Sequence, residues 1–403
     1  MKVLYVVSAT QVTGGGSKSF LNLLHGVIHH GVEPLVVLPD KGKMYQDLQK
    51  EGIKVANCFY RFNTYPPFDN KFKNILLFIP RLFGRIMANT IGTFQLCRIC
   101  NTFRPDIIHT NVSVTGIGYF ASRLLHIPHI WHLREYGDAD FNLHYIPTKY
   151  WQQLRYTKAR SYTICITKDI QKYNNLTKNA TSRVIYNGIF PYADASYHPS
   201  KKPYILFAGR IQPAKGVLEL ISAYIAYSKL CQNPLPLHIA GSGHDIEYMG
   251  KCTKMVADAC LQKQVIFLGE IEDINTLYQE ASAVIVPSLR EGFGRVAAEA
   301  MYQGALVVGN NTGGTKEQLD NGKMLLGEEI GLPYVTQEQL VQHLLNITHT
   351  IHTDTFIATY EPMILKGQKT VRELYSNEQY VENIVHFYEE IISNQFDIKE
   401  LRP

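Results

Sequence analysis

Residues 283–317 read AVIVPSLREGFGRVAAEAMYQGALVVGNNTGGTKE. The apolar run at 284–287 predicts a buried strand, which the turn Glu291-Gly292-Phe293-Gly294, a helix and a second strand at 305–309 follow. Gly292 and Gly294 let a ligand approach backbone N–H groups closely, and the start of the next helix carries a positive dipole end that suits an anion. With Glu291 in the turn and Glu299 in the helix, this stretch predicts a ligand site that holds two carboxylates beside an anion-binding turn.

The first half of the chain has the rhythm of a doubly wound α/β domain. A strand at 2–8, the glycines Gly14, Gly15 and Gly16, an amphipathic helix and a strand at 35–38 form a βαβ unit. Further strands are predicted at 107–109, 129–132, 161–166 and 183–185, with helical segments between them. We therefore predict a mostly parallel sheet covered by helices.

The second half repeats this rhythm. A polar, proline-bearing stretch at 191–203 reads as a linker, and a new strand begins at 204–208. A helix at 216–229, strands at 237–240 and 265–268 and a helix at 274–281 lead into the stretch quoted above. After residue 375, Ser376-Asn377-Glu378-Gln379 has the form of a capping box and precedes an apolar stripe, which predicts an amphipathic last helix.

These pieces resemble the retaining glycosyltransferases of family four, which have the GT-B fold. The matching segments are Thr13-Gly14-Gly15-Gly16, VIYNGIF at 184–190, FAGRIQPAKG at 207–216, EGFGRVAAE at 291–299 and GGTKE at 313–317. The resemblance implies an α/β fold of two Rossmann-like domains that face each other across a cleft, with a C-terminal helix crossing back. The expected parts are an acceptor-side domain at 1–190, the linker at 191–203, a nucleotide-sugar-binding domain at 204–375 and the returning helix at 376–403.

The resemblance also implies roles for residues of the second half. Breaking the anomeric C–O bond of a nucleotide diphosphate sugar leaves negative charge on the departing phosphate, which cations or N–H groups must meet. Arg210 and Lys215 match the family's diphosphate-binding pair, Glu291 is expected to orient the sugar, and Glu299 to hold the ribose. The predicted donor site is completed by Gly292, Phe293, Gly294 and Arg295. Since no residue stands out as a nucleophile, the leaving phosphate itself is expected to help deprotonate the acceptor.

Residues of the first half are expected to complete the site. His132, in HIWHLRE, matches a family histidine that contacts the donor sugar, and Arg134 and Glu135 follow it toward the acceptor. Gly15 and Gly16 lie between strand and helix, where backbone N–H groups point toward phosphate or acceptor. A dinucleotide-binding alternative fails at the third glycine of G-x-G-x-x-G, where Ser19 stands, and it leaves the second half unexplained.

Composition limits the other classes of function. The 403 residues suffice for two domains, and the formal net charge of +5 does not demand nucleic acid as a partner. Seven scattered cysteines suit a reducing compartment, and His126, His129 and His132 are interrupted by Pro128, so we predict no metal site. No apolar stretch reaches the roughly 20 residues that span a bilayer. A cytoplasmic protein is expected.

Residues 59–104 are basic and rich in apolar side chains. Asp69 is the single acidic residue of this segment. Its basic residues are Arg61, Lys71, Lys73, Arg81, Arg85, Arg98 and Arg104. Such a segment suits the anionic inner face of a membrane and a lipid-linked acceptor. An ordinary helix pair with a solvated basic face is the alternative.

The sequence therefore predicts a glycosyltransferase of hexosyltransferase type. It would move a sugar from a nucleotide diphosphate sugar to a glycan or lipid-linked acceptor in polysaccharide or glycolipid biosynthesis, without cofactor or metal. Two alternatives remain, a nucleotide-sugar epimerase of the same fold and a non-catalytic nucleotide-sugar-binding subunit. The VIYNGIF stretch, together with the pair Arg210 and Lys215 and the pair Glu291 and Glu299, favours transfer over epimerisation. The presence of these four charged residues argues against the non-catalytic subunit.

Overall fold

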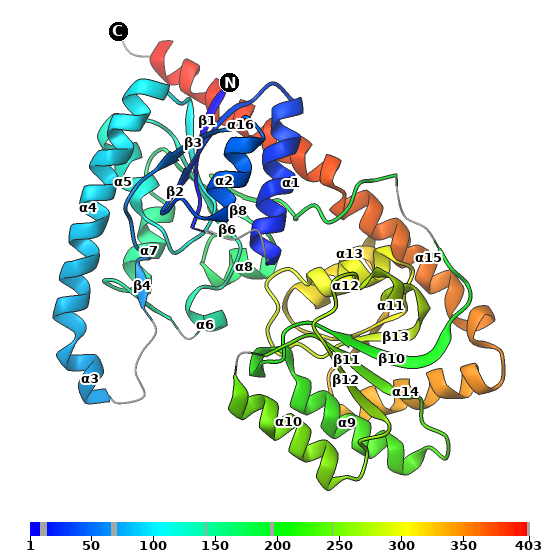
Figure 1. Cartoon of the computed structure of the whole chain (residues 1–403). Coiled ribbons are helices and arrows are strands. Elements are labelled where there is room, and N and C mark those ends of the chain that lie inside the picture. Colours follow the sequence, from blue (N-terminus) through cyan, green and yellow to red (C-terminus); the bar gives the residue numbers. More distant parts are fainter. Residues whose placement is uncertain (9–13, 66–70, 142, 194–196, 244, 401–403) are drawn as a thin grey trace. The chain divides into compact units, whose positions relative to one another are not determined.

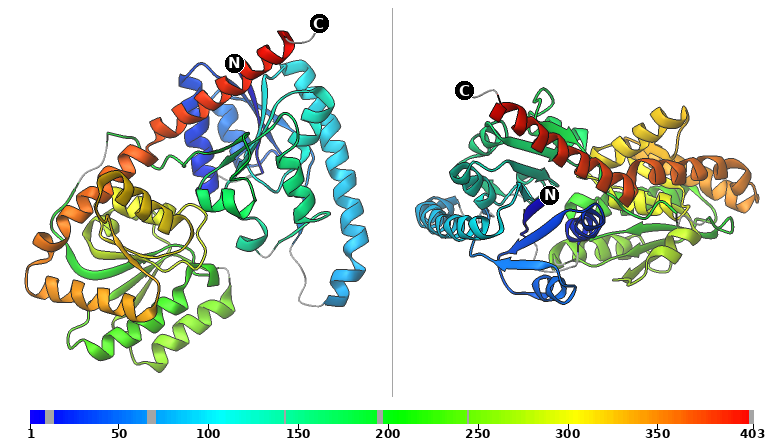
Figure 2. Two further views of the ribbon diagram at one scale, coloured as in Figure 1. Left: turned by 180° about the vertical axis from the view of Figure 1, so that it is seen from behind. Right: turned by 90° about the horizontal axis from the view of Figure 1, so that it is seen from above.

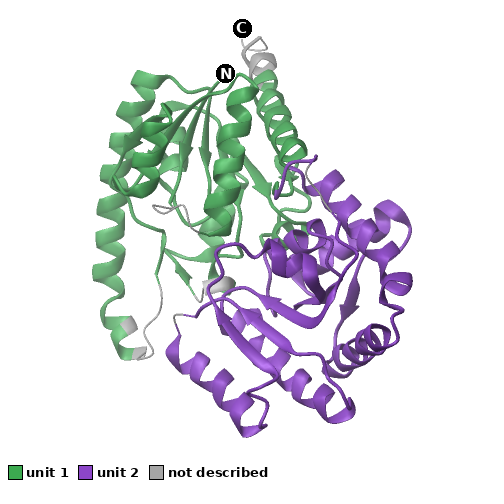
Figure 3. Ribbon diagram, turned by 45° about the vertical axis from the view of Figure 1, so that its right-hand side comes forward, with its two compact units in different colours: residues 1–188, 377–403 green, residues 189–376 purple. Residues whose placement is uncertain are grey.

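The chain forms two compact units, and each is described by itself (Figures 1 and 3). Our computed structural model describes residues 1–8, 14–65, 71–141, 143–193, 197–243 and 245–400. Unit 1 comprises Met1–Gly188 and Asn377–Pro403, and unit 2 comprises Ile189–Ser376. Thr13 of the predicted glycine loop lies outside the described residues.

Unit 1 contains a parallel sheet with the strand order β3-β2-β1-β5-β6-β8-β9. The chain builds outward from β1 to β3 and then continues on the other side of β1 with β5, so the winding direction changes between β1 and β5. The central strands are buried on both faces, as a sheet covered on both sides requires. The strands are β1 (Lys2–Val6), β2 (Glu33–Leu38), β3 (Lys54–Asn57), β5 (Ile107–Thr110), β6 (His129–Leu133), β8 (Ser161–Cys165) and β9 (Ser182–Val184).

Helices cover this sheet, and a short antiparallel pair lies beside them. The pair joins β4 (Thr64–Tyr65) to β7 (His144–Tyr145). Figure 1 shows α4 as the longest helix of the unit, with α3 directly before it. The helices are α1 (Gly15–His29), α2 (Lys43–Lys50), α3 (Lys71–Leu76), α4 (Phe78–Phe103), α5 (Ile117–Leu125), α6 (Asp138–Phe141), α7 (Lys149–Tyr156), α8 (Lys168–Tyr173) and α16 (Asn377–Glu400).

The last helix, α16, belongs to unit 1 and confirms the predicted return to the first domain. It runs beside α1 (Figure 2), and its apolar stripe joins the same core as β1 and α1. The two helices approach closely at Gly26, because a Cβ at that position would lie 2.3 Å from a methyl group of Val381. A larger residue at 26 would therefore push α16 away from α1.

Unit 2 has a second parallel sheet, in the order β12-β11-β10-β13-β14-β15. Its winding direction changes between β10 and β13. The strands are β10 (Lys202–Ala208), β11 (Leu237–Ala240), β12 (Val265–Gly269), β13 (Ala281–Val286), β14 (Val307–Asn310) and β15 (Leu332–Tyr334). The helices are η1 (Pro213–Lys215), α9 (Val217–Leu230), α10 (Ile246–Asp258), α11 (Asn275–Glu280), α12 (Arg295–Tyr302), α13 (Gly313–Leu326), α14 (Gln337–His352) and α15 (Phe356–Tyr375).

The two sheets confirm the predicted α/β class, with two Rossmann-like halves. Residues 191–203, expected as a linker, are in part held by unit 2: Lys201 Nζ donates to the carbonyl oxygens of Gln279 and Gly304 at 2.6 and 2.7 Å. No helix in the described part of the chain is both long and apolar enough to span a bilayer.

Candidate functional site

The predicted donor residues gather at the carboxyl edge of the unit 2 sheet. The loop after β10 carries Arg210 and Lys215, and the loop after β13 carries Glu291. These two strands are neighbours and flank the point where the winding direction changes, which is where open α/β sheets bind ligands.

Lys215 and Glu291 form an ion pair across this edge. Lys215 Nζ lies 2.6 Å from Glu291 Oε2, and Ser288 Oγ donates to the same carboxylate oxygen at 3.0 Å. The two charged side chains are only 19% and 13% exposed. Gly216 makes the close approach possible, because its φ is 67° and a Cβ would lie 2.0 Å from the carbonyl oxygen of Pro287. The pair thus holds a cation and a carboxylate close enough for one ligand to contact both.

The glycine turn after Glu291 is fixed against the start of α13. The backbone N–H of Gly314 donates to the carbonyl oxygen of Glu291 at 2.7 Å, and Gln318 Nε2 donates to the carbonyl oxygens of Phe293 and Gly294 at 2.5 and 3.1 Å. A Cβ at position 314 would lie 2.3 Å from the carbonyl carbon of Phe293. Residue 314 must therefore be glycine for the turn to keep this position.

Arg295 and Glu299 form a second ion pair, on α12. The Arg295 guanidinium donates to Glu299 Oε1 from Nε at 3.1 Å and from Nη2 at 2.8 Å. Gly294, with a φ of 88°, precedes the helix, so Glu299 lies little more than one turn from the start of the helix. Both predicted ligand-binding residues are partly exposed and pair with each other.

Arg210 behaves differently from these pairs. It follows β10 after Gly209, and its side chain is exposed. Across the residues that the structure describes, its guanidinium has no hydrogen bond or ion pair. An arginine that is available in this way suits an incoming anion.

In unit 1, the predicted His132 lies on β6 and is completely buried. Its Nδ1 atom is 3.1 Å from Nε2 of His109 on β5 and 3.4 Å from Nη2 of Arg134. His109 Nδ1 is 2.5 Å from the hydroxyl of Tyr388 on α16, which is 3.1 Å from the hydroxyl of Tyr5. Two histidines and two tyrosines thus form one buried chain.

The direction of every proton in this chain follows from Arg134. A guanidinium can only donate, so His132 Nδ1 accepts and its proton is on Nε2. Burial, and after it the charge of Arg134, lowers the pKa of both histidines well below 6.5, so both are neutral. His109 then donates from Nε2 to His132 and accepts from Tyr388, which accepts from Tyr5. His132 Nε2 is the remaining donor, and among the described residues it has no partner.

Arg134 is held from three sides. It donates to Asn111 Oδ1 at 3.0 Å, to Asn187 Oδ1 at 2.6 Å and to the hydroxyl of Tyr380 on α16 at 2.8 Å. These contacts give Arg134 a structural task that the sequence did not predict, since they connect α16 to the carboxyl edge of the sheet. Its role toward an acceptor stays a prediction.

Glu135 and the glycines lie at the same edge of unit 1. Glu135 accepts from the backbone N–H and the hydroxyl of Ser113 at 3.0 and 2.8 Å. Gly15 and Gly16 open α1 after Gly14, whose φ is 116°. A Cβ on Gly16 would meet no atom within 4 Å, so packing in the described residues does not require glycine there.

Sequence reasoning missed Ser288, His109, Tyr380 and Tyr388. Ser288 follows β13 directly and had a positional signal, because residues after strand ends commonly line sites in this fold. The two tyrosines belong to the apolar stripe predicted for the last helix, and their hydroxyl groups give no separate signal.

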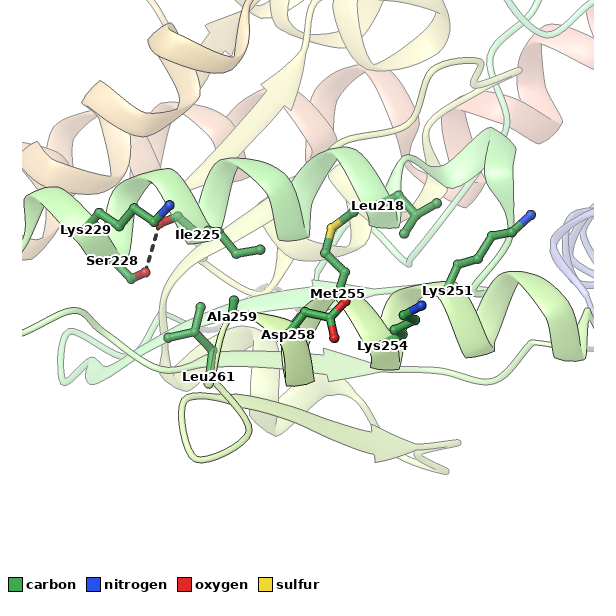
Figure 4. Close-up of a pocket in the computed structure, with 10 residues that line it drawn as sticks. All are labelled: Leu218, Ile225, Ser228, Lys229, Lys251, Lys254, Met255, Asp258, Ala259 and Leu261. Carbon is green, nitrogen blue, oxygen red and sulfur yellow. Dashed lines mark hydrogen bonds between the residues drawn. The ribbon is translucent and has the colours of Figure 1, made fainter.

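A hollow of about 780 Å³ elsewhere in unit 2 contains none of the predicted residues. It lies between α9 and α10, where Figure 4 shows Lys229, Lys251 and Lys254 at its rim and Met255 and Leu218 inside. Lys251 already pairs with Glu247 at 2.6 Å. The size of this hollow does not make it the functional site.

Solved structures share the fold of the whole chain. The Anabaena protein HepE in complex with UDP superposes with a TM-score of 0.75 and 19% identity over 97% of this chain and 100% of HepE. A glycosyltransferase from Rickettsia africae gives 0.74 and 19% identity over 98% and 99% of the two chains. At this level of identity the likeness concerns the fold.

Family matches decide the class of protein. Residues 13–191 match Glycosyltransferase Family 4, and residues 192–348 match Glycosyl transferases group 1. The protein is a GT-B glycosyltransferase. An uncharacterised glycosyltransferase of Methanocaldococcus jannaschii is 26% identical to it over 78% of this chain and 88% of that relative.

A second relative of the glycosyltransferase has a named acceptor. It is an alpha-1,4-N-acetyl-D-galactosaminyltransferase of Campylobacter jejuni, 23% identical over 75% of this chain and 77% of its own, and its name specifies a GalNAc-containing glycan on PP-undecaprenol.

Proposed function

We propose that this glycosyltransferase moves a hexosyl group from a nucleotide diphosphate sugar to a hydroxyl of a glycan or lipid-linked acceptor, with retention of anomeric configuration. The ion pair between Lys215 and Glu291 supports the proposal, because a cation suited to a diphosphate lies beside a carboxylate suited to sugar hydroxyls at the sheet edge. UDP in the HepE complex supports a nucleotide donor.

The proposed donor contacts follow from the charges of unit 2. Arg210 and Lys215 stabilise the negative charge that develops on the leaving phosphate, and Glu291 orients the sugar through its hydroxyls. Glu299 accepts from the ribose hydroxyls, and Arg295 orients Glu299 through their ion pair. Backbone N–H groups of the turn from Gly292 through Phe293 to Gly294 face the phosphates.

The proposed roles in unit 1 are donation and acceptor binding. His132, with its proton on Nε2, donates to the donor sugar, and Gly15, Gly16 and Glu135 contact the acceptor. The leaving phosphate takes the proton of the acceptor hydroxyl on the face from which it departs. No cofactor or metal enters this mechanism.

We place the enzyme in the cytoplasm, at the inner face of the membrane, in polysaccharide or glycolipid biosynthesis. The named acceptor of the Campylobacter relative supports a lipid-linked substrate. The cations of residues 59–104 support contact with anionic lipid.

A thermal-shift screen of UDP-, GDP-, ADP- and dTDP-sugars tests the donor, with NAD and NADP as controls. Because a ligand that binds the folded state raises its stability, one nucleotide class is expected to raise Tm, and Glu299→Ala to abolish the shift. A shift with NAD alone would contradict the proposal. The epimerase alternative predicts conversion of the donor without acceptor, and the non-catalytic alternative predicts binding without turnover.

A further inference from the structure

Unit 1 contains an apolar groove that the proposed donor contacts do not use. Its volume is about 570 Å³, within the range of pockets that bind small molecules. It lies between α4, α5 and the segment after β7, and its apolar lining consists of Leu82, Ile86, Phe94, Phe120, Leu124, Ile146 and Pro147.

The groove opens onto an exposed apolar stripe of α4. The stripe follows the helical repeat along the outer face of α4, as Ile79, Phe83, Ile86, Met87, Ile91 and Phe94. Exposed apolar patches of this kind mark membrane or ligand contacts. The groove is thus continuous with a surface that favours hydrocarbon over water.

Polar donors also line the groove. Asn63 is only 6% exposed, and its Nδ2 atom has no hydrogen-bond partner among the described residues, while its Oδ1 atom accepts from Asn89 Nδ2 at 2.8 Å. Nδ2 of Asn63 lies against Gly116, so Asn63 adds a polar point to the lining while the charge of the groove comes from its arginines.

Two arginines of the groove are uncompensated. Arg85 donates to the carbonyl oxygen of Thr64 at 3.2 Å, and Arg155 donates to Gln152 Oε1 at 3.1 Å, but neither pairs with a carboxylate in the described ranges. Burial, and after it the charges of Arg81 and Arg61, lowers the pKa of Arg85, and burial lowers that of Arg155. Half-buried cations without counter-charge favour an anion.

We propose that this groove binds the lipid carrier of the acceptor, with its hydrocarbon chain along the apolar lining and its phosphate against Arg85 and Arg155. The inference rests on the proposed transfer to a lipid-linked acceptor and locates the lipid in unit 1. The combination of apolar lining and uncompensated arginines matches the two chemical parts of a lipid phosphate, whereas a neutral lipid would leave both arginines unpaired.

Isothermal titration with farnesyl phosphate, below its micelle concentration, tests the groove directly. We expect saturable binding, weaker binding of farnesol and much weaker binding of inorganic phosphate, because each supplies only one of the two parts. Arg85→Gln and Leu124→Glu are each expected to weaken binding of farnesyl phosphate by about tenfold. Arg85→Lys keeps the positive charge and is expected to bind farnesyl phosphate more tightly than Arg85→Gln.

Phe83→Glu is the matched control. Phe83 and Phe94 lie on the same stripe and are 66% and 60% exposed, but only Phe94 lines the groove. Phe94→Glu should weaken binding of farnesyl phosphate and Phe83→Glu should not. Equal binding by all variants, or no binding by the unaltered protein, would overturn the proposal. If anionic vesicles bind but farnesyl phosphate does not, the surface contacts bulk membrane lipid instead.

The donor screen separates this inference from the proposed function. Nucleotide-sugar binding by unit 2 is expected to be unchanged in Arg85→Gln and Leu124→Glu. Loss of lipid binding with intact donor binding supports the groove. Donor binding without any lipid binding would reject the groove and leave the glycosyl donor assignment standing.

Discussion

The carboxyl edges of the two sheets hold their polar side chains in opposite states. In unit 2, Lys215 with Glu291 and Arg295 with Glu299 are partly exposed ion pairs. In unit 1, the chain from Tyr5 through Tyr388 and His109 to His132 is fully buried and neutral. The edge of unit 2 carries charged groups that can bind a charged ligand. The edge of unit 1 fixes the direction of one hydrogen-bond donor, His132 Nε2.

In the proposed function, this difference matches two needs of a transfer reaction. A diphosphate needs mobile counter-charges, and a paired lysine can exchange its carboxylate partner for a phosphate. A sugar hydroxyl needs a donor of fixed direction, and a buried chain of hydrogen bonds supplies it without reorganisation.

The largest expected effect comes from breaking the ion pair of unit 2. Glu291→Gln or Lys215→Ala should lower kcat by about 10²- to 10³-fold, because each removes a group that we propose to contact the reacting sugar or the leaving phosphate. The measurement is the rate of sugar transfer from the donor that the thermal-shift screen identifies. Lys316→Ala, which breaks an exposed ion pair with Asp320 on α13, is the control and should leave kcat unchanged. Unaltered kcat in both Glu291→Gln and Lys215→Ala would show that the ion pair of unit 2 has no part in the reaction.

The next effect tests the support of the glycine turn. Gly314→Ala places a methyl group within 2.3 Å of the Phe293 carbonyl carbon, so the turn must shift, and a shift of about 1 Å can cost about 10²-fold in rate. Donor affinity and kcat measure it. Gly250→Ala, in α10 with no atom within 4 Å of the added Cβ, should be neutral or stabilising. Equal behaviour of the two variants would show that the turn is not held by this contact.

The pH dependence of stability tests whether the buried histidines of unit 1 are neutral in the folded protein. Burial lowers the pKa of His129 to about 3, and those of His109 and His132 also lie well below 6.5. The unfolded chain therefore binds protons that the folded unit does not, so the stability is fully present above about pH 6.5 and falls as pH falls below it. Each histidine should contribute a slope of about 1.4 kcal/mol per pH unit.

Urea unfolding at pH 5 and pH 7 measures this slope. Both tryptophans, Trp131 and Trp151, lie in unit 1, so their fluorescence reports on that unit. His132→Gln should flatten the slope by the share of one histidine. A slope that is unchanged in this variant would mean that His132 is charged in the folded protein.

The smallest effect concerns the hydroxyl of Tyr388. Tyr388→Phe removes the hydroxyl that donates to His109 Nδ1, and we expect about a threefold to tenfold loss of kcat with little change in KM. Tyr162→Phe, on β8 in the same unit, is the control. A loss of stability with unchanged kcat would give Tyr388 a purely structural role.

Much of unit 2 could be predicted from the sequence because its site is local. The turn from Glu291 to Gly294 and the helix with Glu299 are adjacent in the chain, and strand ends of one sheet brought Lys215 to Glu291. The buried chain of unit 1 could not be predicted, since Tyr380 meets Arg134 across 246 residues and Tyr388 meets His109 across 279. Sequence periodicity gave the helix that carries both tyrosines, but not the residues that their hydroxyl groups reach.

The return of α16 to unit 1 has a consequence for protein synthesis. All residues of unit 2 leave the ribosome before residue 377. Unit 1 is therefore incomplete until α16, which follows unit 2 in the chain, has been synthesised. Until that helix arrives, Arg134 lacks Tyr380 and His109 lacks Tyr388. A chain that stops before α16 therefore lacks the two tyrosine hydroxyls that contact Arg134 and His109.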